Sequence, residues 1–159
     1  MMQLRQRTRR LLHGKPVTPQ IPYSETEPMA DCCCGNNNKK TVLVYACSGG
    51  ANVAEIADRA ARELMFAGEG TMWCLAGLGA DIQGMVQTAR DADVNLVIDG
   101  CPMECAKKIF DRHGVPYSYL KVTDLGIEKV KGVRCAPEQV EKVLAKAREM
   151  LAGDGKCCG

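Results

Sequence analysis

Aromatic residues, histidine and long apolar runs are scarce in this 159-residue chain, and their scarcity excludes several classes of protein. Aromatic residues make up 4%, too few for the stacking surface that binds single-stranded nucleic acid. No run of about 18 apolar residues marks a membrane span. The first 40 residues also lack the apolar core of a secretory signal peptide. We therefore expect a cytoplasmic protein that neither crosses a membrane nor binds nucleic acid.

The charges of the chain are nearly balanced, at 21 basic and 19 acidic residues. The basic excess lies before Met29, where arginines are clustered, so the rest of the chain is close to neutral. A nucleic-acid-binding domain normally carries a basic patch, and the near-neutral charge of the residues from Met29 onward predicts no such patch. Hydrophobic residues make up 46%, which is enough for one packed domain of ordinary size.

The two ends of the chain differ in composition from its middle. Residues 1–39 are rich in arginine and then in proline, which predicts a disordered tail. The composition changes abruptly at Met29, which we take as a candidate natural start. Residues 153–159 are expected to form a flexible second tail. Both tails carry adjacent cysteines, either accessory metal or sulfur handles or exposed thiols without a defined role: Cys32, Cys33, Cys34, Cys157 and Cys158.

Residues 40–152 alternate short apolar runs with amphipathic segments, a pattern typical of strands and helices in turn. We expect strands at 41–46, 71–76, 95–98 and 117–122, and helices at 52–67, 82–92, 102–112 and 137–151. Their short links predict an α/β domain, with a small parallel sheet of four to five strands and helices on both faces. The order is expected to be flavodoxin-like or Rossmann-like, such as 2-1-3-4. Ligands then bind at the carboxyl ends of the first and third strands, where the order switches.

Cysteine is abundant, at 10 of 159 positions against two histidines. In a cytosolic α/β protein, clustered cysteines are metal ligands or redox thiols more often than disulfides. Cys47, Cys74 and Cys101 stand 27 residues apart, each at or near the end of an expected strand. Because the carboxyl ends of parallel strands meet at one edge of the sheet, we expect these thiols to converge. Cys105 lies four residues after Cys101, on the same face of the next helix, and joins them.

Four converging thiols suit a tetrahedral Zn²⁺ ion, which binds sulfur at about 2.3 Å without redox chemistry. We expect a helix to begin at Pro102, where free N–H groups would favour the thiolate forms of Cys101 and Cys105. The spacing leaves other interpretations open. Cys74 inside an apolar run is also typical of a buried core thiol. Cys101 and Cys105 are also compatible with a redox or sulfur-transfer dithiol.

Other polar residues near this edge of the sheet are weaker candidates for a role in the site. Asp99 and Asp124 end strands, and each could orient a ligand or a bound water, or cap a helix or turn. His113 is excluded as a ligand because it stands at the opposite end of the helix from Cys101.

Three common anion-binding motifs are absent from the chain. A phosphatase or arsenate reductase needs an arginine six positions after the thiol, and position 53 is Val53. The turn at Gly49-Gly50-Ala51-Asn52 lacks the lysine of a nucleotide-binding P-loop. No G-x-G-x-x-G opens the first helix, so dinucleotide binding has no support.

Four stretches carry a further motif: Tyr45-Ala-Cys-Ser-Gly49 with Asn52, Cys74-Leu-Ala-Gly77, Asp99-Gly-Cys-Pro-Met-Glu-Cys-Ala-Lys-Lys108, and Val122-Thr-Asp-Leu-Gly126. Together they resemble the DGC-domain family over about residues 40–127, and neither cysteine-rich tail is covered. The four cysteines that this family is proposed to use for zinc fall on Cys47, Cys74, Cys101 and Cys105.

The resemblance implies a protein that holds one Zn²⁺ through four cysteines at the carboxyl edge of its sheet, in metal handling or sensing. The metal ion is the expected partner, and the family supplies no established reaction. A thiol-based redox or sulfur-transfer enzyme that uses Cys101 and Cys105 remains the alternative.

Overall fold

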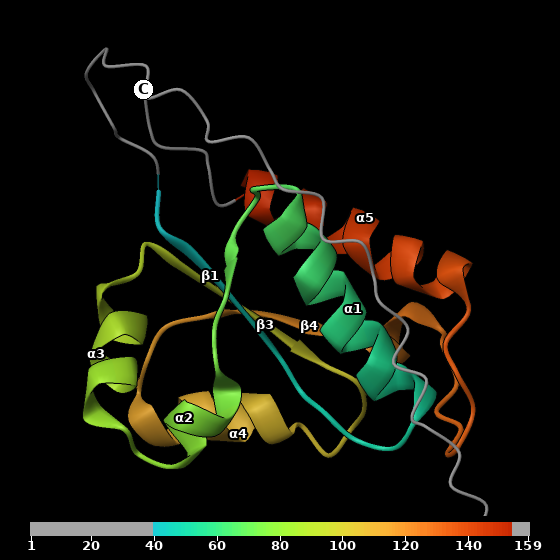
Figure 1. Ribbon diagram of the computed structural model, residues 1–159, viewed down its shortest axis with the longest axis horizontal. Coiled ribbons are helices and arrows are strands. Elements are labelled where there is room, and N and C mark those ends of the chain that lie inside the picture. The colour runs from blue at the N-terminus through green and yellow to red at the C-terminus, as the bar shows by residue number, and fades with distance from the viewer. Residues whose placement is uncertain (1–39, 154–159) are drawn as a thin grey trace, which may run out of the picture. The chain divides into compact units, whose positions relative to one another are not determined.

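The computed structural model of the chain describes residues 40–153 (Figure 1). The predictions made for the two tails therefore lie outside the described residues. They include the disorder of both ends, the candidate start at Met29, and any role of the adjacent cysteines.

Within the described residues, four parallel strands form a sheet in the order β2-β1-β3-β4. The strands are β1 (Val42–Ala46), β2 (Thr71–Met72), β3 (Val94–Asp99) and β4 (Ser118–Lys121). The two central strands, β1 and β3, consist almost wholly of buried residues, as expected for parallel strands that are covered on both faces. The α/β class and the predicted strand order are confirmed.

Helices cover both faces of this sheet (Figure 1). On one face lie α1 (Asn52–Phe66) and α5 (Pro137–Gly153). On the other face lie α2 (Leu75–Gly79), α3 (Gln83–Asp91) and α4 (Cys105–His113). The 3₁₀ helix η1 (Val122–Leu125) follows β4 directly. No helix within residues 40–153 is long and apolar enough to cross a membrane.

Each face of the sheet has its own hydrophobic core. On the α1 and α5 face, residues at helical spacing on α1, among them Val53, Ile56 and Leu64, are almost fully buried. On the opposite face, Phe110 of α4 packs edge-on against Tyr45 of β1, with ring centroids 4.7 Å apart. Burial of each such side chain contributes about 1.5–3 kcal/mol, so the two cores fix the positions of both strand ends.

The second strand is shorter than the sequence predicts. β2 ends at Met72, and the rest of the expected strand 71–76 turns into helix α2, with Cys74 as its N-cap residue. Leu78 of α2 is fully buried in the core beneath α4, which is the packing that favours a helix here. A short apolar run does not by itself distinguish a strand from a buried helix. Cys74 consequently lies directly before the start of a helix and not at the end of a strand.

The helix that carries Cys105 also begins later than expected. It starts at Cys105 and not at Pro102, because Glu104 adopts a left-handed backbone conformation with φ of 52°. Cys101 therefore lies in the turn between β3 and α4 and does not cap the helix. β4 is likewise shorter than the expected 117–122, since Val122 begins η1.

Gly100 fixes how closely the end of β3 approaches α1. A Cβ atom built on Gly100 would lie 2.9 Å from the backbone carbon and oxygen of Val53. Real side chains do not tolerate such a distance to backbone atoms, so any larger residue would push β3 and α1 apart. Because Gly100 has no side chain, the loops that follow β1 and β3 can lie close together.

We predict that Gly100→Ala lowers the free energy of unfolding by about 1–3 kcal/mol, because the added methyl group overpacks a backbone contact. Gly50→Ala is the matched control, since a Cβ on Gly50 meets no atom within 4 Å. Urea denaturation of the two variants measures the difference. Equal stability of Gly100→Ala and Gly50→Ala would contradict the close approach of β3 to α1.

Candidate functional site

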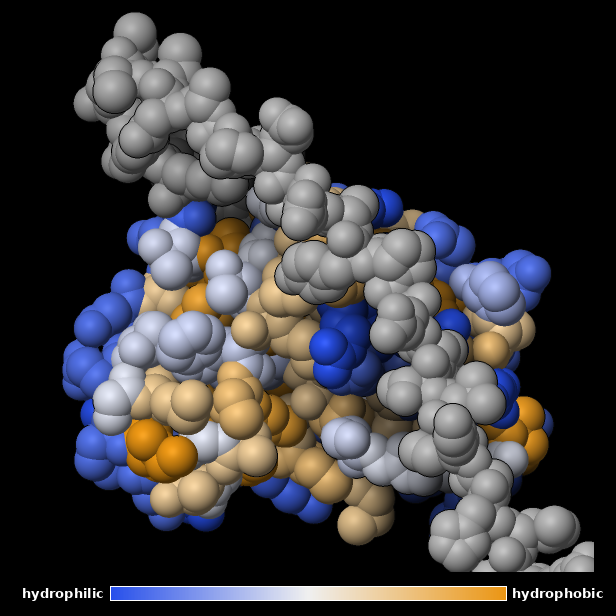
Figure 2. Space-filling model, in the orientation of Figure 1, coloured by the Kyte–Doolittle hydropathy of each residue, from blue (hydrophilic) through white to orange (hydrophobic). Residues whose placement is uncertain are grey.

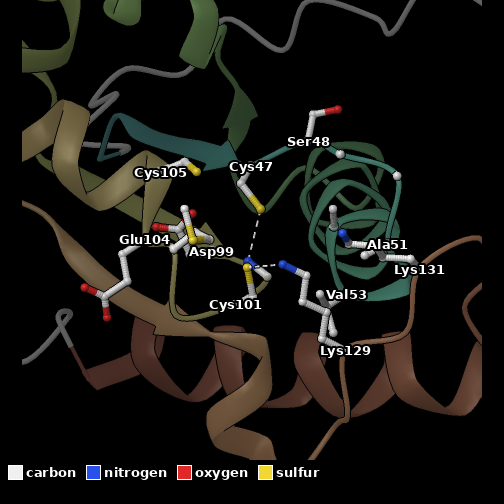
Figure 3. A pocket seen from close by; sticks show the side chains of 15 residues that line it. Cys47, Ser48, Ala51, Val53, Asp99, Cys101, Glu104, Cys105, Lys129 and Lys131 are labelled. Atoms are coloured by element: carbon white, nitrogen blue, oxygen red, sulfur yellow. Dashed lines mark hydrogen bonds between the residues drawn. The ribbon is translucent and has the colours of Figure 1, made fainter.

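A cavity of about 230 Å³ opens at the carboxyl ends of β1 and β3, where the strand order switches (Figure 3). Its wall comes from the loop after β1 with the first turn of α1, from the turn between β3 and α4, and from a later segment that supplies Lys129 and Lys131. The sequence predicts a ligand site at this edge, and the thiol pocket, as we call this cavity, lies there.

The thiol pocket brings together three of the four predicted ligands. Cys47, Cys101 and Cys105 all line it, the first from the loop after β1 and the other two from the segment that joins β3 to α4. Cys74 is exposed at the start of α2 and does not line it. Nowhere in residues 40–153 are three cysteine, histidine, aspartate or glutamate side chains grouped closely enough to hold a metal ion.

Cys47 lies at the floor of the thiol pocket and is only 7% exposed. Its backbone N–H donates to the carbonyl of Ile98, and its sulfur accepts the backbone N–H of Gly100 at 3.0 Å (Figure 3). Burial raises the pKa of Cys47 to about 11, although the Gly100 N–H opposes this effect. In the absence of a metal, Cys47 is therefore a neutral thiol at neutral pH.

Cys101 has the opposite electrostatic environment. The backbone N–H of Met103 lowers its pKa most, and the ammonium group of Lys129, 3.1 Å from the sulfur, lowers it further. Figure 3 shows the Lys129 side chain reaching toward this sulfur. Because both donors favour the charged form, the pKa of Cys101 is lowered below the ordinary value of a cysteine. The sequence predicts that N–H groups of a helix beginning at Pro102 stabilise the thiolate. In the structure the backbone N–H of Met103 and the ammonium of Lys129 have this role at Cys101.

Asp99 serves as the cap of α4. Its buried carboxylate accepts the backbone N–H groups of Ala106 at 3.1 Å and Lys107 at 2.9 Å. This anchors the first turn of α4, and with it Cys105, to the end of β3. Of the two roles that the sequence leaves open for Asp99, helix capping is the one with observed contacts.

The exposed edge of the pocket also carries Glu104. Its carboxylate lies 3.3 Å from the ammonium of Lys121 and 3.5 Å from that of Lys107. In Figure 3 it points away from Cys101. The carboxylates of Asp99 and Glu104 thus bind partners other than the cysteine sulfurs. Asp124 is exposed and pairs with Lys121 at 3.2 Å, so its observed contact is an ion pair.

Residues 127–132, which we call the strap, were missed by the sequence interpretation. Asn52, buried at the start of α1, donates its side-chain N–H to the carbonyl of Glu128 at 2.9 Å. Its side-chain oxygen accepts the backbone N–H of Val130 at 2.7 Å. These contacts place Lys129 and Lys131 at the pocket. The signal that could have found the strap is Asn52 itself, a polar residue that opens an otherwise apolar helix face.

His113 lies at the C-terminal end of α4, with Cys105 at the other end. Its ring nitrogen is 2.8 Å from the carbonyl oxygen of Leu78, so it joins α4 to α2. It does not line the thiol pocket, which agrees with its exclusion as a ligand.

The DGC domain family matches residues 43–147 of this chain, which includes the whole thiol pocket and the strap. The chain belongs to the DGC domain family. This DGC domain is 37% identical over 115 residues to the "Anaerobic and virulence modulator AnvM" of Pseudomonas aeruginosa. The alignment covers 72% of this chain and 88% of that relative. No solved structure matches the chain.

We predict that Asn52→Ala loosens the strap, because the backbone N–H of Val130 and the carbonyl of Glu128 both lose their side-chain partner. The loss costs about 1–3 kcal/mol. Hydrogen exchange should accelerate at the Val130 amide more than global destabilisation explains. Asn95→Ala, which removes a buried asparagine bonded to Ala89 and Pro116, is the control and should lower stability without selective exchange in the strap.

We further predict that the thiols of the metal-free protein differ in alkylation rate. Iodoacetamide should modify Cys101 faster than Cys47 at neutral pH, because only the thiolate reacts and Cys47 ionises at about pH 11. The Cys101 rate should reach its half-maximum below the ordinary pKa of a cysteine.

Lys129→Met should move the midpoint of Cys101 to higher pH, since one donor to its sulfur is lost. Lys108→Met on the exposed side of α4 should leave the midpoint unchanged. Peptide mass spectrometry of the alkylated protein measures each site. A faster reaction at Cys47 than at Cys101 would refute the assignment of the two environments.

Proposed function

We propose that this protein binds one Zn²⁺ ion through Cys47, Cys74, Cys101 and Cys105, in metal handling or sensing. The observation that carries the proposal is the convergence of Cys47, Cys101 and Cys105 on one pocket from positions up to 58 residues apart. The pocket lies at the carboxyl ends of the central strands, where open α/β sheets bind their ligands.

Cysteine side chains are suitable zinc ligands, but within residues 40–153 they do not lie close enough together to bind one ion as they stand. Sulfur is a preferred zinc ligand, and N–H donors beside the thiols stabilise the negative charge of bound thiolates. The Gly100 N–H on Cys47 and the Lys129 ammonium on Cys101 are such donors. Binding at about 2.3 Å from each sulfur requires the side chains to turn inward. Cys74 also requires the first turn of α2 to move toward the pocket.

Metal binding would also ionise Cys47, a thiol that burial otherwise keeps protonated at neutral pH. A bound Zn²⁺ displaces the proton of each cysteine ligand, so the free energy of binding is coupled to deprotonation. Cys47, whose pKa is about 11 without metal, makes zinc affinity rise with pH across the neutral range. Four thiolates leave no coordination position for water, which favours storage, transfer or sensing of the ion over hydrolysis. The name of the Pseudomonas relative, a modulator, is compatible with sensing.

A second function has one specific observation in its favour. The Lys129 ammonium and the Met103 N–H activate Cys101 as a thiolate, as a nucleophilic cysteine needs. With Cys105 as its partner, Cys101 could reduce a disulfide: the two thiols give up two protons and two electrons and become a disulfide, while the substrate becomes two thiols. A thiol-based redox or sulfur-transfer function predicts that the protein is free of metal.

We predict that the protein purified without oxygen carries one zinc per chain, measured by mass spectrometry of the metal. Replacing Cys47, Cys101 or Cys105 by serine should each lower zinc affinity by at least about 100-fold, because changes outside the ligand shell already cost 10–100-fold. Cys135→Ser is the control, since Cys135 lies outside the pocket and should keep wild-type affinity.

Cys74→Ser separates a four-thiol site from a three-thiol one. Weakened binding in this variant supports four ligands, and wild-type affinity would contradict the assignment of Cys74. A wild-type protein that is free of zinc, takes none up from solution and forms a Cys101–Cys105 disulfide would overturn the zinc proposal in favour of the redox one.

A further inference from the structure

We infer that the thiol pocket also takes a small organic anion, whose charged group binds Lys129, Lys131 and the loop that follows Cys47. This inference deepens the proposed function and rests on it for the role of the pocket. It names what the same pocket accepts besides the metal ion.

The first support is the size of the cavity. A volume of about 230 Å³ exceeds what one ion needs, since a water molecule occupies about 30 Å³ in the liquid. Apolar side chains form part of its wall, among them Val53, Ala54 and Met103. Small-molecule sites typically combine such an apolar wall with a few convergent polar groups. A ligand with a small apolar body fits these surroundings.

The second support is the imbalance of charge around the cavity. Among the described residues, no carboxylate lies within ion-pair distance of Lys129 or Lys131. The two acids of the pocket are engaged elsewhere: Asp99 accepts N–H groups of α4, and Glu104 pairs with Lys107 and Lys121. Neither lysine has a carboxylate partner within residues 40–153, and Lys131 has no thiol partner either, which favours a ligand that carries negative charge.

The contact with the Cys101 sulfur engages only one of these cations. Lys129 donates to the sulfur of Cys101, but no contact of the Lys131 side chain with any thiol is observed. The strap nevertheless fixes the backbone at Lys131, which pairs with Ala51 in an isolated antiparallel bridge. The adjacent Gly132 N–H donates to the carbonyl of Gly50 at 3.0 Å. Lys131 is therefore held at the pocket by its backbone, and its ammonium remains available to a ligand.

The loop after Cys47 supplies further donors at the same wall. Within the described chain, the backbone N–H groups of Ser48, Gly49 and Gly50 donate to no protein acceptor. All three residues are exposed and line the cavity, so their N–H groups are accessible. Together with the two lysines they could satisfy the several acceptor positions of a carboxylate.

The test uses benzoate as the probe and benzamide as its uncharged analogue of similar shape. Backbone amide NMR signals of the full-length protein are followed during titration, both before and after zinc is added. Benzoate should shift the signals of Gly49, Gly50 and Gly100 saturably, and benzamide should bind at least about tenfold more weakly, which is about 1.4 kcal/mol. Added salt should weaken benzoate binding, since exposed cations contribute to it.

Lys131→Met is the decisive variant, because Lys131 contacts no thiol and its loss should leave zinc content unchanged. It should bind benzoate about tenfold more weakly. Lys108→Met, which removes an exposed lysine outside the pocket, should bind benzoate like the wild type. Wild-type benzoate affinity in Lys131→Met, or the absence of saturable shifts at these glycines in the wild type, would overturn the inference.

Zinc content is measured on every sample, so that the two proposals fail separately. A protein that holds zinc but shows no benzoate binding contradicts the anion site alone. A protein that binds benzoate through Lys131 but takes up no zinc contradicts the metal proposal and supports the anion site.

Discussion

The contact between the sulfur of Cys47 and the backbone N–H of Gly100 is the interaction on which the site depends. It joins the loop after β1 to the turn after β3, the two segments that adjacent parallel strands deliver to the same edge of the sheet. Gly100 allows the approach because it has no side chain to meet the backbone of Val53. Pairing of β1 with β3 brings Cys47 and Cys101 to the same edge, and this contact holds the Cys47 sulfur against the turn that carries Cys101.

A second set of polar contacts completes the pocket from the far half of the chain. Asn52 binds the strap, and Glu55, one turn later on α1, accepts the backbone N–H of Cys135 at 3.0 Å. This N–H is also the main reason why the pKa of Glu55 is lowered. The first turn of α1 therefore holds the segment that brings Lys129 to the Cys101 sulfur and Lys131 to the pocket wall, so both cations of the site come from about 80 positions after Cys47.

The sequence predicts the parts of this structure that depend on burial. The apolar runs at 41–46 and 95–98 predict strands because both faces are covered, and the structure has them at Val42–Ala46 and Val94–Asp99. The first helix is predicted because Val53, Ile56 and Leu64 share one face. Predictions fail where local and tertiary preferences differ: α2 replaces a strand end because Leu78 fills the core beneath α4. For the site, the sequence predicts four thiols at one edge; Cys47, Cys101 and Cys105 line the pocket there, and Cys74 does not. The strap lysines follow no periodic pattern. The contacts that hold the strap join Asn52 to residues 76 and 78 positions away, so Asn52 is the one local signal for it.

X-ray absorption spectroscopy of the zinc-loaded protein tests the central claim most directly, because it counts the atoms bound to the ion. We expect four sulfur neighbours at about 2.3 Å, and one sulfur fewer when Cys47 is replaced by serine. A shell made mainly of nitrogen or oxygen atoms at about 2.0–2.1 Å would contradict a thiolate centre in this pocket.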